Sequence, residues 1–300
     1  MLSSMLDAQL LALPDYNLIP ATFGYIFAGV VGAIFGSFLN VVIHRVPREE
    51  SIVFPNSKCP NCSAVIAFYD NIPVLSYVVL GGKCRGCKKR ISPRYPAVEL
   101  LTALLFVAVA WHDGLSVALP FDLTFVAAIV ALVFIDAEHM ILPNVITYPG
   151  IVFAAVARIV IPLIGPPHFD DLPSLMHGAF ADLPIWTVSI IGAGIGALIG
   201  GGSLWLMGWT WERLRGIEAM GLGDVKMMFM VGAYLGWRLT ILTIFVGVLS
   251  GSIIGILLMA RQGKRDMRML LPFGVFLGLG AIAALLWGSH LVEWYAGQFR

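Results

Sequence analysis

The chain carries little charge for its length. Only 12% of its 300 residues are Asp, Glu, Lys or Arg, whereas 59% are hydrophobic and the mean hydropathy is +0.87. A soluble globule of this size needs far more polar surface, so the composition excludes that class. The sequence instead predicts an all-α polytopic membrane protein surrounded by lipid. The net charge of +1 gives no basis for a nucleic-acid partner, and none is expected.

Lysine and arginine are absent from residues 1–44. This start lacks the basic region of a secretory signal, and we expect the N-terminus to lie outside the cell. Nine of the 19 Lys and Arg residues then fall between Arg45 and Arg94. Because basic loops stay on the inner side of a membrane, this loop is expected to be cytoplasmic. Further inner loops are expected around Arg213, Arg215 and Lys226, and around Arg261, Lys264, Arg265 and Arg268.

Eight apolar stretches lie between these loops and predict about eight transmembrane helices. Their expected ranges are 23–44, 97–111, 121–136, 145–164, 185–208, 225–237, 239–260 and 271–287. We expect three parts: an outer N-terminus with the first span (1–44), a cytoplasmic loop (45–96) and a transmembrane core (97–300). One outer loop is expected to hold His112, Asp113 and Asp122, and a second to hold His168, Asp170, Asp171 and Asp182. Arg158 is expected to extend toward the outer face.

Glycines recur four residues apart in several spans, a spacing that lets membrane helices approach closely. They are Gly32 and Gly36, then Gly192, Gly196 and Gly200, then Gly247, Gly251 and Gly255, and finally Gly274 and Gly278. A phosphate-binding loop at Gly192 is excluded because that motif follows a strand in a soluble βαβ unit.

Cysteine is equally scarce, and its positions are informative. The four cysteines form two Cys-x-x-Cys pairs, Cys59 with Cys62 and Cys84 with Cys87, with 21 residues between the pairs. Similar spacing is typical of a zinc ribbon, in which four thiolates close a structural metal site. Two disulfides are the alternative in an oxidising compartment. A cytoplasmic loop favours zinc.

Two aspartates stand at the edges of apolar spans, Asp136 and, 88 positions later, Asp224. A single acid at such a place often only reaches the aqueous interface, but two on the same side favour catalysis. Two carboxylates that share a site cannot both ionise easily, so one keeps a proton while the other activates water. Gly221 and Gly223 precede Asp224 and permit a bend and a close approach of substrate backbone.

The helix dipole predicts different roles for the two acids. Asp224 is expected to precede a helix that begins at Val225, where the positive end of the dipole favours a carboxylate. Asp136 is expected to close a helix at its negative end. We therefore expect Asp224 to be ionised and Asp136 to hold the proton, with Lys226 adding to this bias only if its ammonium turns inward.

With these motifs in place, the chain resembles the bacterial type IV prepilin leader peptidases. The matching segments cover most of the chain: 36–45, both Cys-x-x-Cys pairs, 70–77, 94–99, Asp136 with Leu142 and Pro143, 221–226 and 272–277. Residue 275 is valine where the Pro-Phe-Gly-Pro pattern has proline.

The resemblance implies a Gly-x-Gly-Asp membrane aspartic protease whose catalytic residues are Asp136 and Asp224, with Gly221, Gly223 and Lys226 in the active-site loop. It implies cleavage of type IV prepilins or pseudopilins at the cytoplasmic face of the bacterial inner membrane, after a glycine that ends a short basic leader. It further implies N-methylation of the new N-terminal residue with S-adenosylmethionine.

Two other function classes stay open from the sequence. Paired intramembrane acids and glycine-interrupted helices also occur in ion-coupled transporters, although those have internal repeats and charge near the midplane. No repeat is found in this sequence, and its two acids stand at span ends. A scaffold that only binds substrate would tolerate the loss of both aspartates.

Overall fold

The structure is a computed structural model that describes residues 21–165, 182–216, 220–262 and 271–298. In these ranges long helices are joined by short connections, the loop after residue 45 contains the short helices η2 (Val46–Arg48), η3 (Phe68–Asn71) and α3 (Leu75–Val79), and β structure amounts to two isolated bridges. The all-α prediction is confirmed. The expected outer N-terminus, the acidic loop at His168, Asp170 and Asp171, and the inner-loop residues Lys264, Arg265 and Arg268 lie outside the described residues.

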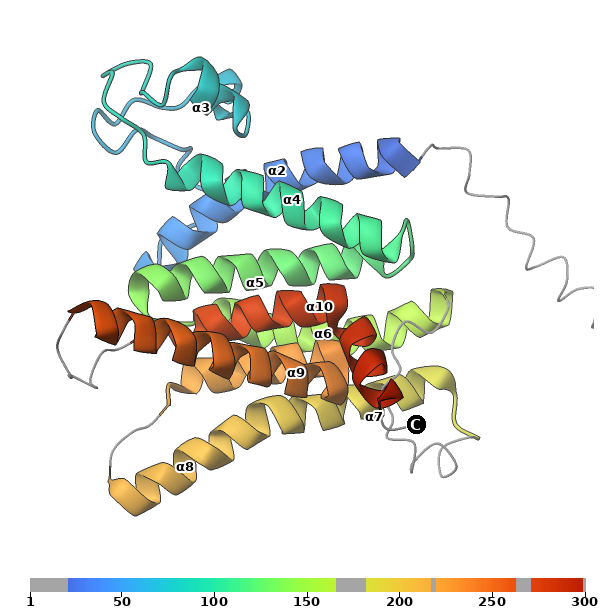
Figure 1. The fold of residues 1–300 in the computed structure, drawn as a ribbon. Helices are drawn as coiled ribbons and strands as arrows, with labels where there is room; N and C mark the ends of the chain where they lie inside the picture. Colours follow the sequence, from blue (N-terminus) through green and yellow to red (C-terminus); the bar gives the residue numbers. More distant parts are fainter. Residues whose placement is uncertain (1–20, 166–181, 217–219, 263–270, 299–300) are drawn as a thin grey trace, which may run out of the picture.

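Long helices make up the bundle in Figure 1. They are α2 (Ala21–Arg45), α4 (Arg94–Asp113), α5 (Leu119–His139), α6 (Asn144–Ile164), α7 (Ile185–Ala197), α8 (Ser203–Arg215), α9 (Leu222–Gln262) and α10 (Phe273–Gly297). A π-helical segment, Leu198–Gly202, joins α7 to α8. Among the described residues, seven helical stretches are long and apolar enough to cross a membrane.

α9 accounts for two of the eight predicted spans. As one straight helix its 41 residues would extend about 60 Å, twice the thickness of the hydrocarbon core. Gly236 interrupts it with φ 79° and ψ 173°, a conformation that only glycine adopts readily. The Thr240 hydroxyl donates to the Gly236 carbonyl at 2.6 Å, which satisfies one backbone acceptor at the break. α9 therefore consists of two helical segments that meet at Gly236 without a loop, and each corresponds to one predicted span.

The helix ends gather at two opposite sides of the bundle. In Figure 1, the C-terminal ends of α2 and α5 lie on the same side as the N-terminal ends of α4, α6, α9 and α10. We call this side the dyad end, because α5 ends and α9 begins with the two aspartates of interest. The loop between α2 and α4, which we call the insertion (residues 46–93), lies above α4 at the same side.

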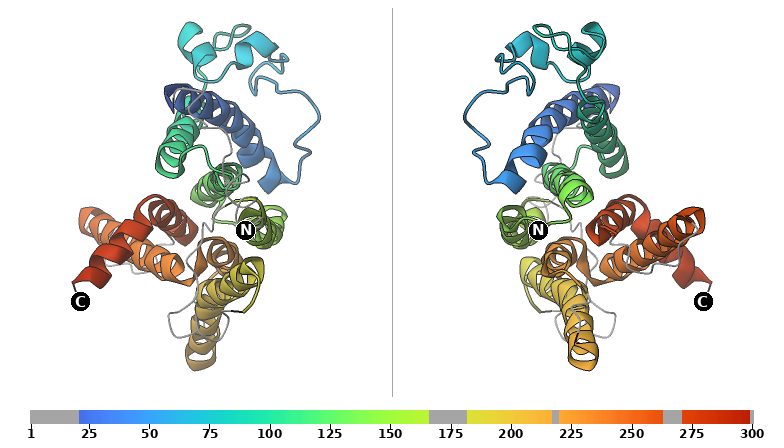
Figure 2. Two further views of the ribbon diagram at one scale, coloured as in Figure 1. Left: turned by 90° about the vertical axis from the view of Figure 1, so that its right-hand side faces the viewer. Right: turned by 90° about the vertical axis from the view of Figure 1, so that its left-hand side faces the viewer.

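α5 is shared by two apolar cores. One core packs α5 against α2 and α4, and the other packs it against α6, α9 and α10. Figure 2 shows α2 and α4 on one side of α5 and the remaining helices on the other. The position of Asp136 therefore depends on both groups of helices.

The glycine spacing marks close helix contacts, as predicted. A Cβ on Gly36 would lie 2.6 Å from the Glu99 Cα, and one on Gly32 would lie 2.8 Å from the Ala103 Cα, so α2 and α4 touch along their backbones. A Cβ on Gly196 of α7 would overlap the carbonyl oxygen of Gly232 of α9. Such contacts need small residues because the backbones themselves are in van der Waals contact.

Two expected surface positions are wrong. α5 begins at Leu119, so Asp122 lies in its first turn, fully buried, and accepts a hydrogen bond from the Tyr234 hydroxyl at 2.8 Å. Arg158 does not reach the outer surface. It is also fully buried, and its Nε donates to the Ala233 carbonyl at 3.1 Å. A buried polar group in a membrane bundle cannot bind bulk water, so these two side chains form hydrogen bonds inside the protein.

Candidate active site

Asp136 lies in the last turn of α5 and is 5% exposed. Its Oδ2 accepts a hydrogen bond from the backbone N–H of Val275 at 3.1 Å, and the N–H of Gly274 also donates to this carboxylate. Both donors belong to the first turn of α10, where backbone N–H groups have no partner inside the helix. Asp136 therefore ends its own helix and meets the beginning of another.

Gly274 allows this approach. A Cβ at this position would lie 2.8 Å from the Asp136 Oδ2 and 3.1 Å from the Leu142 Cδ1. Any side chain would therefore push the start of α10 away from the carboxylate.

Asp224 lies in the first turn of α9. The helix begins at Leu222, three residues earlier than predicted, because the Asp224 N–H closes the first turn on the Gly221 carbonyl at 3.1 Å. Gly223 is helical, and it provides a close contact rather than the expected bend: its Cβ would lie 2.9 Å from the Leu142 Cβ. Gly221 directly precedes the helix and is exposed.

The two carboxylates form a dyad at one end of the bundle. They interact electrostatically, and Leu142 packs against both the glycine before Asp224 and the glycine that covers Asp136. Four predicted site residues, Asp136, Gly221, Gly223 and Asp224, are thus brought together from α5 and the start of α9. The donors from α10 were not foreseen, because Gly274 and Val275 lie 138 and 139 positions from Asp136.

Lys226 turns away from this dyad. Its Nζ donates to the Asn144 Oδ1 at 2.8 Å and lies 5.2 Å from the centre of the Tyr148 ring, so it joins α9 to the start of α6. The ammonium thus has partners of its own on α6.

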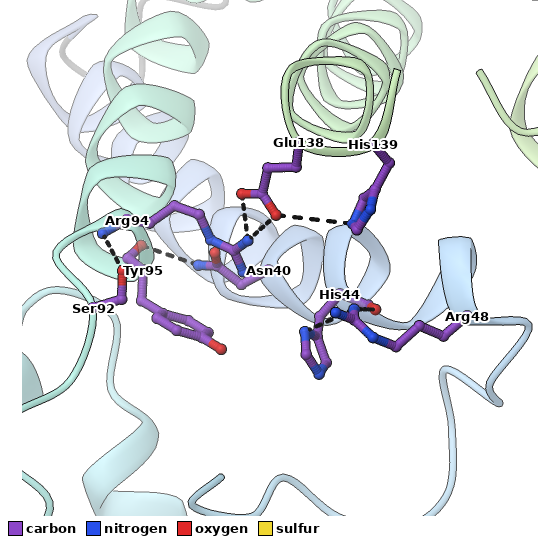
Figure 3. Close-up of polar contacts among 8 residues, drawn as sticks. All are labelled: Asn40, His44, Arg48, Ser92, Arg94, Tyr95, Glu138 and His139. Carbon is purple, nitrogen blue, oxygen red and sulfur yellow. Dashed lines mark hydrogen bonds and ion pairs between the residues drawn. The ribbon is translucent and has the colours of Figure 1, made fainter. Parts of the chain in front are cut away.

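A second polar cluster lies beside the end of α5 (Figure 3). Arg94, the first residue of α4, forms an ion pair with Glu138, and the His139 Nε2 lies 4.0 Å from the same carboxylate. Asn40 of α2 donates to the Tyr95 carbonyl at 3.0 Å. The Asn40 Oδ1 and the Arg94 Nε are buried and have no hydrogen-bond partner among the described residues. Glu138 and His139 are close to Asp136 in the sequence and Arg94 stands in a matching segment, but the sequence does not predict the pairing of Arg94 with Glu138 across 44 positions.

The insertion contains two turns of the same shape. In one, the Cys59 N–H donates to the Ala64 carbonyl and the Ser63 N–H to the Cys59 carbonyl; in the other, Cys84 pairs in the same way with Lys89 and Lys88. Each turn holds a positive φ four residues after its first cysteine, 56° at Ser63 and 57° at Lys88. The two turns thus present their cysteines alike.

The four thiols face one another at distances that suit a metal. All four Sγ atoms lie within 4.8 Å of one another, with Cys59 at 3.9 Å from Cys87 and Cys62 at 4.0 Å from Cys84. A tetrahedral Zn–S bond of about 2.3 Å gives S···S distances of about 3.8 Å, far longer than a disulfide bond. The thiols are free, so the cluster fits the predicted zinc-ribbon-like insertion and not the disulfide alternative.

A buried carboxylate attaches the insertion to the bundle. The Glu99 Oε2 accepts a hydrogen bond at 2.7 Å from the backbone N–H of Val74, whose φ of 59° is unusual for a β-branched residue. Within the insertion, Arg85 makes two hydrogen bonds to Asp70, and this charged partner lowers the pKa of the Asp70 carboxyl.

The chain matches two protein-family models and several individual proteins that share one name. Residues 30–113 match the bacterial peptidase A24 N-terminal domain, and residues 123–256 match the type IV leader peptidase family. A protein of Pseudomonas aeruginosa named prepilin leader peptidase/N-methyltransferase is 35% identical, over 89% of this chain and 91% of its own. Proteins of the same name from Aeromonas hydrophila and Myxococcus xanthus are 37% and 39% identical, over 88% and 84% of this chain and 91% and 69% of their own.

No solved structure matches the chain. The relatives are named as peptidases, so the transporter alternative has no support from them. The seven described helices that are long and apolar enough to span a membrane, together with the bacterial relatives, indicate a multi-pass bacterial membrane protein. Matches that cover nearly the whole length, at 35–39% identity, place this chain in the type IV leader peptidase family.

Proposed function

We propose that this protein is a membrane aspartic endopeptidase that removes the leader of type IV prepilins or pseudopilins and then N-methylates the new N-terminus. The observation that carries the peptidase activity is the pair of carboxylates, Asp136 and Asp224, that meets at one end of an apolar bundle. Ionisable side chains are costly in an apolar bundle, so two that meet there indicate a functional site.

The dyad can hydrolyse a peptide bond without a covalent intermediate. The ionised aspartate takes a proton from water as the oxygen attacks the peptide carbonyl, and the protonated aspartate gives its proton to the carbonyl oxygen. When the C–N bond breaks, the first aspartate returns its proton to the leaving amine, and the second regains one from the diol. The pair ends as it began.

The position of the dyad fits a substrate that is partly in the membrane. A prepilin presents a basic leader followed by an apolar segment, so its scissile bond would lie at the dyad end while the apolar segment stays in lipid. We propose that the dyad end is cytoplasmic, because Arg45, Arg94 and Arg215 end or begin helices there and basic residues favour that side.

We propose zinc as the metal of the insertion, held by Cys59, Cys62, Cys84 and Cys87. Four thiolates leave no open position for substrate, so the ion would hold the fold of the insertion and take no part in hydrolysis.

The methyl donor implied by the relatives' names is S-adenosylmethionine, which supplies a methyl group for the amine that hydrolysis releases. The cluster of Figure 3 fits the amino-acid end of this donor, because Arg94 suits a carboxylate and Glu138 an ammonium. The unpartnered Asn40 Oδ1 and Arg94 Nε leave hydrogen-bonding capacity there. We propose that these residues hold the donor beside α5.

Peptidase activity is tested with purified protein in lipid nanodiscs and a prepilin, with product masses measured by mass spectrometry. Asp136→Asn and Asp224→Asn should each abolish leader removal, because the amide keeps the shape but cannot exchange the proton. An Asn variant that is inserted normally and cleaves at near the wild-type rate would contradict the assignment of Asp136 and Asp224 as the catalytic dyad.

Methylation is tested in the same assay with S-adenosylmethionine, on a substrate supplied already cleaved. The wild type should add the mass of one methyl group, and Arg94→Met should weaken donor binding measured directly by isothermal titration. Unchanged donor affinity in Arg94→Met would show that the donor binds elsewhere.

A further inference from the structure

The two acids of the dyad have unequal surroundings. Asp136 accepts backbone hydrogen bonds from Val275 and Gly274, whereas no hydrogen bond to the Asp224 carboxylate is found among the described residues. A Cβ on Gly221 would lie 3.5 Å from the Asp224 Oδ2, an ordinary van der Waals distance. A carboxylate that accepts N–H donors favours the ionised form, and one without donors gives up its proton less readily.

Both acids also lie at the positive end of a helix dipole. Asp224 is in the first turn of α9, whereas the sequence predicts that it precedes this helix, and Asp136 is in contact with the first turn of α10. The dipole therefore acts on both members, and the direct N–H donors are what distinguish them. The contact with α10 could not be predicted from sequence, where only α5, the helix of Asp136 itself, was expected to act on this residue.

We propose that the backbone N–H of Val275 holds Asp136 as the ionised base of the dyad, so that Asp224 is the member that carries the proton. This assignment rests on the proposed peptidase function and reverses the roles expected from the sequence. In hydrolysis, Asp136 takes the proton from water and later returns it to the amine, while Asp224 protonates the carbonyl oxygen and is then reprotonated by the diol. Val275 acts through Asp136 and is a positioning residue.

Residue 275 makes the proposal specific to this chain. Proline, the residue of the Pro-Phe-Gly-Pro pattern, has no N–H and could not make the 3.1 Å hydrogen bond. The helix itself tolerates proline at residue 275, which is in the first turn of α10, where proline removes no helical hydrogen bond. The Asp136 carboxylate would have to move back from the proline Cδ that replaces the N–H. Gly274 precedes it and lacks the Cβ that contributes to the clash before a proline.

Other charged groups around Asp136 have partners elsewhere. Asp224 of α9 interacts with it directly. Glu138 and His139 follow it on α5, with Glu138 held by Arg94 of α4; His44 of α2 contacts Arg48; and Lys226 of α9 is held by Asn144 of α6. The described ionisable groups of α10, His290, Glu293 and Tyr295, lie at its opposite end. None of these groups changes when residue 275 is replaced.

The test compares Val275→Pro with Val275→Ala in the full-length protein, by the pH dependence of kcat/KM for leader cleavage. Alanine keeps the N–H and should leave the profile unchanged. Proline should keep the enzyme active but move the acidic limb to higher pH by about one unit, because one charge-assisted hydrogen bond to the base is lost. The size of this shift corresponds to roughly tenfold lower activity well below the limb.

Profiles of the two variants that superimpose would overturn the proposal, as would a proline profile in which only the basic limb moves. Both outcomes leave the peptidase assignment intact, which the two Asn variants test separately. If Val275→Pro fails to accumulate, the wild type decides: infrared spectroscopy with carboxyl-labelled aspartate, assigned with the Asn variants, should place the protonated carboxyl on Asp224. A protonated carboxyl on Asp136 would sink the assignment.

Discussion

At the scale of single residues, the space at Gly274 sets how closely α10 approaches Asp136. The residue has no side chain, and the Asp136 Oδ2 and the Leu142 Cδ1 occupy the room that a Cβ would need. The N–H donors of α10 reach the carboxylate only because this contact is made at backbone distance. Small changes here should alter catalysis more than folding.

Gly274→Ala should therefore lower kcat/KM for leader cleavage by roughly tenfold to hundredfold, the effect expected when a catalytic group is displaced by about 1 Å. The matched control is Gly194→Ala in α7, where a Cβ would have nothing within 4 Å. The measurement is initial cleavage rate at equal amounts of inserted protein. Equal rates for the two variants would contradict the role of Gly274.

The sequence predicts the identity of both aspartates, because each stands where an apolar span meets glycines or polar residues. Solvation at the aqueous interface explains one such acid more easily than two on the same side. It does not predict the donors of Asp136. Val275 lies 139 positions away, and a hydrogen bond over such a separation depends on how α10 packs against α5. Lys226 shows the same limit, since its partner Asn144 is 82 positions away.

At the scale of elements, the insertion is held by the contact between Val74 and α4. The Val74 backbone is strained at φ 59°, and the Glu99 carboxylate is the acceptor for its N–H at 2.7 Å. Strain of this kind persists only where surrounding contacts enforce it.

Glu99→Ala should loosen the insertion, because the Val74 N–H loses its acceptor at a cost of about 1–3 kcal/mol. Limited proteolysis within residues 46–93 should become faster. Glu99→Gln keeps an acceptor oxygen and should stay near the wild type, and Val74→Gly should partly rescue Glu99→Ala by removing the strain. Indistinguishable proteolysis of the Ala and Gln variants would argue against this anchor.

The contact between α7 and α9 is a second test at this scale. A Cβ on Gly232 would overlap the Gly196 carbonyl oxygen, and backbone cannot move aside as a side chain can. Gly232→Ala should cost about 1–3 kcal/mol of stability and lower the unfolding temperature, again compared with Gly194→Ala. The unfolding temperature is measured by the intrinsic fluorescence of the protein in nanodiscs. An unchanged value would mean that α7 and α9 can move apart without loss of stability.

The helices themselves follow closely from the sequence, since apolar length marks a span and four-residue glycine spacing marks a contact. The failures have a common cause. Asp122 and Arg158 were placed at the outer surface because charge is costly in lipid, yet each is buried with a partner from α9, Tyr234 or the Ala233 carbonyl. Hydropathy measures the cost of a charge and carries no information about its partner.

At the scale of the whole molecule, the insertion lies outside the two apolar cores and has few buried residues of its own. A short polar segment of this kind needs a staple to fold, and four thiolates provide one.

Elemental analysis of protein purified without chelator should therefore find one zinc per chain, and Cys84→Ser should lose it. The same variant should show faster proteolysis of the insertion, while helical content of the bundle stays unchanged. Four titratable free thiols together with no bound metal would refute the zinc site.

Orientation is also a property of the whole chain. If the dyad end is cytoplasmic, trypsin should cut the insertion, which carries Lys58, Lys83 and Lys88, in inverted membrane vesicles and leave it intact in spheroplasts. Cleavage in spheroplasts would reverse the proposed topology.

The meeting of α5 with α10 also sets when, during synthesis, the enzyme can begin to work. Asp136 emerges from the ribosome 139 residues before Val275, and Asp224 emerges between them. α10 is made after α5 and α9, so the carboxylate of Asp136 gains its donors only once α10 has been synthesised. A growing chain that has inserted α5 and α9 thus carries both acids without the donors of Asp136, and we expect the dyad to complete its hydrogen bonds only when α10 packs against α5.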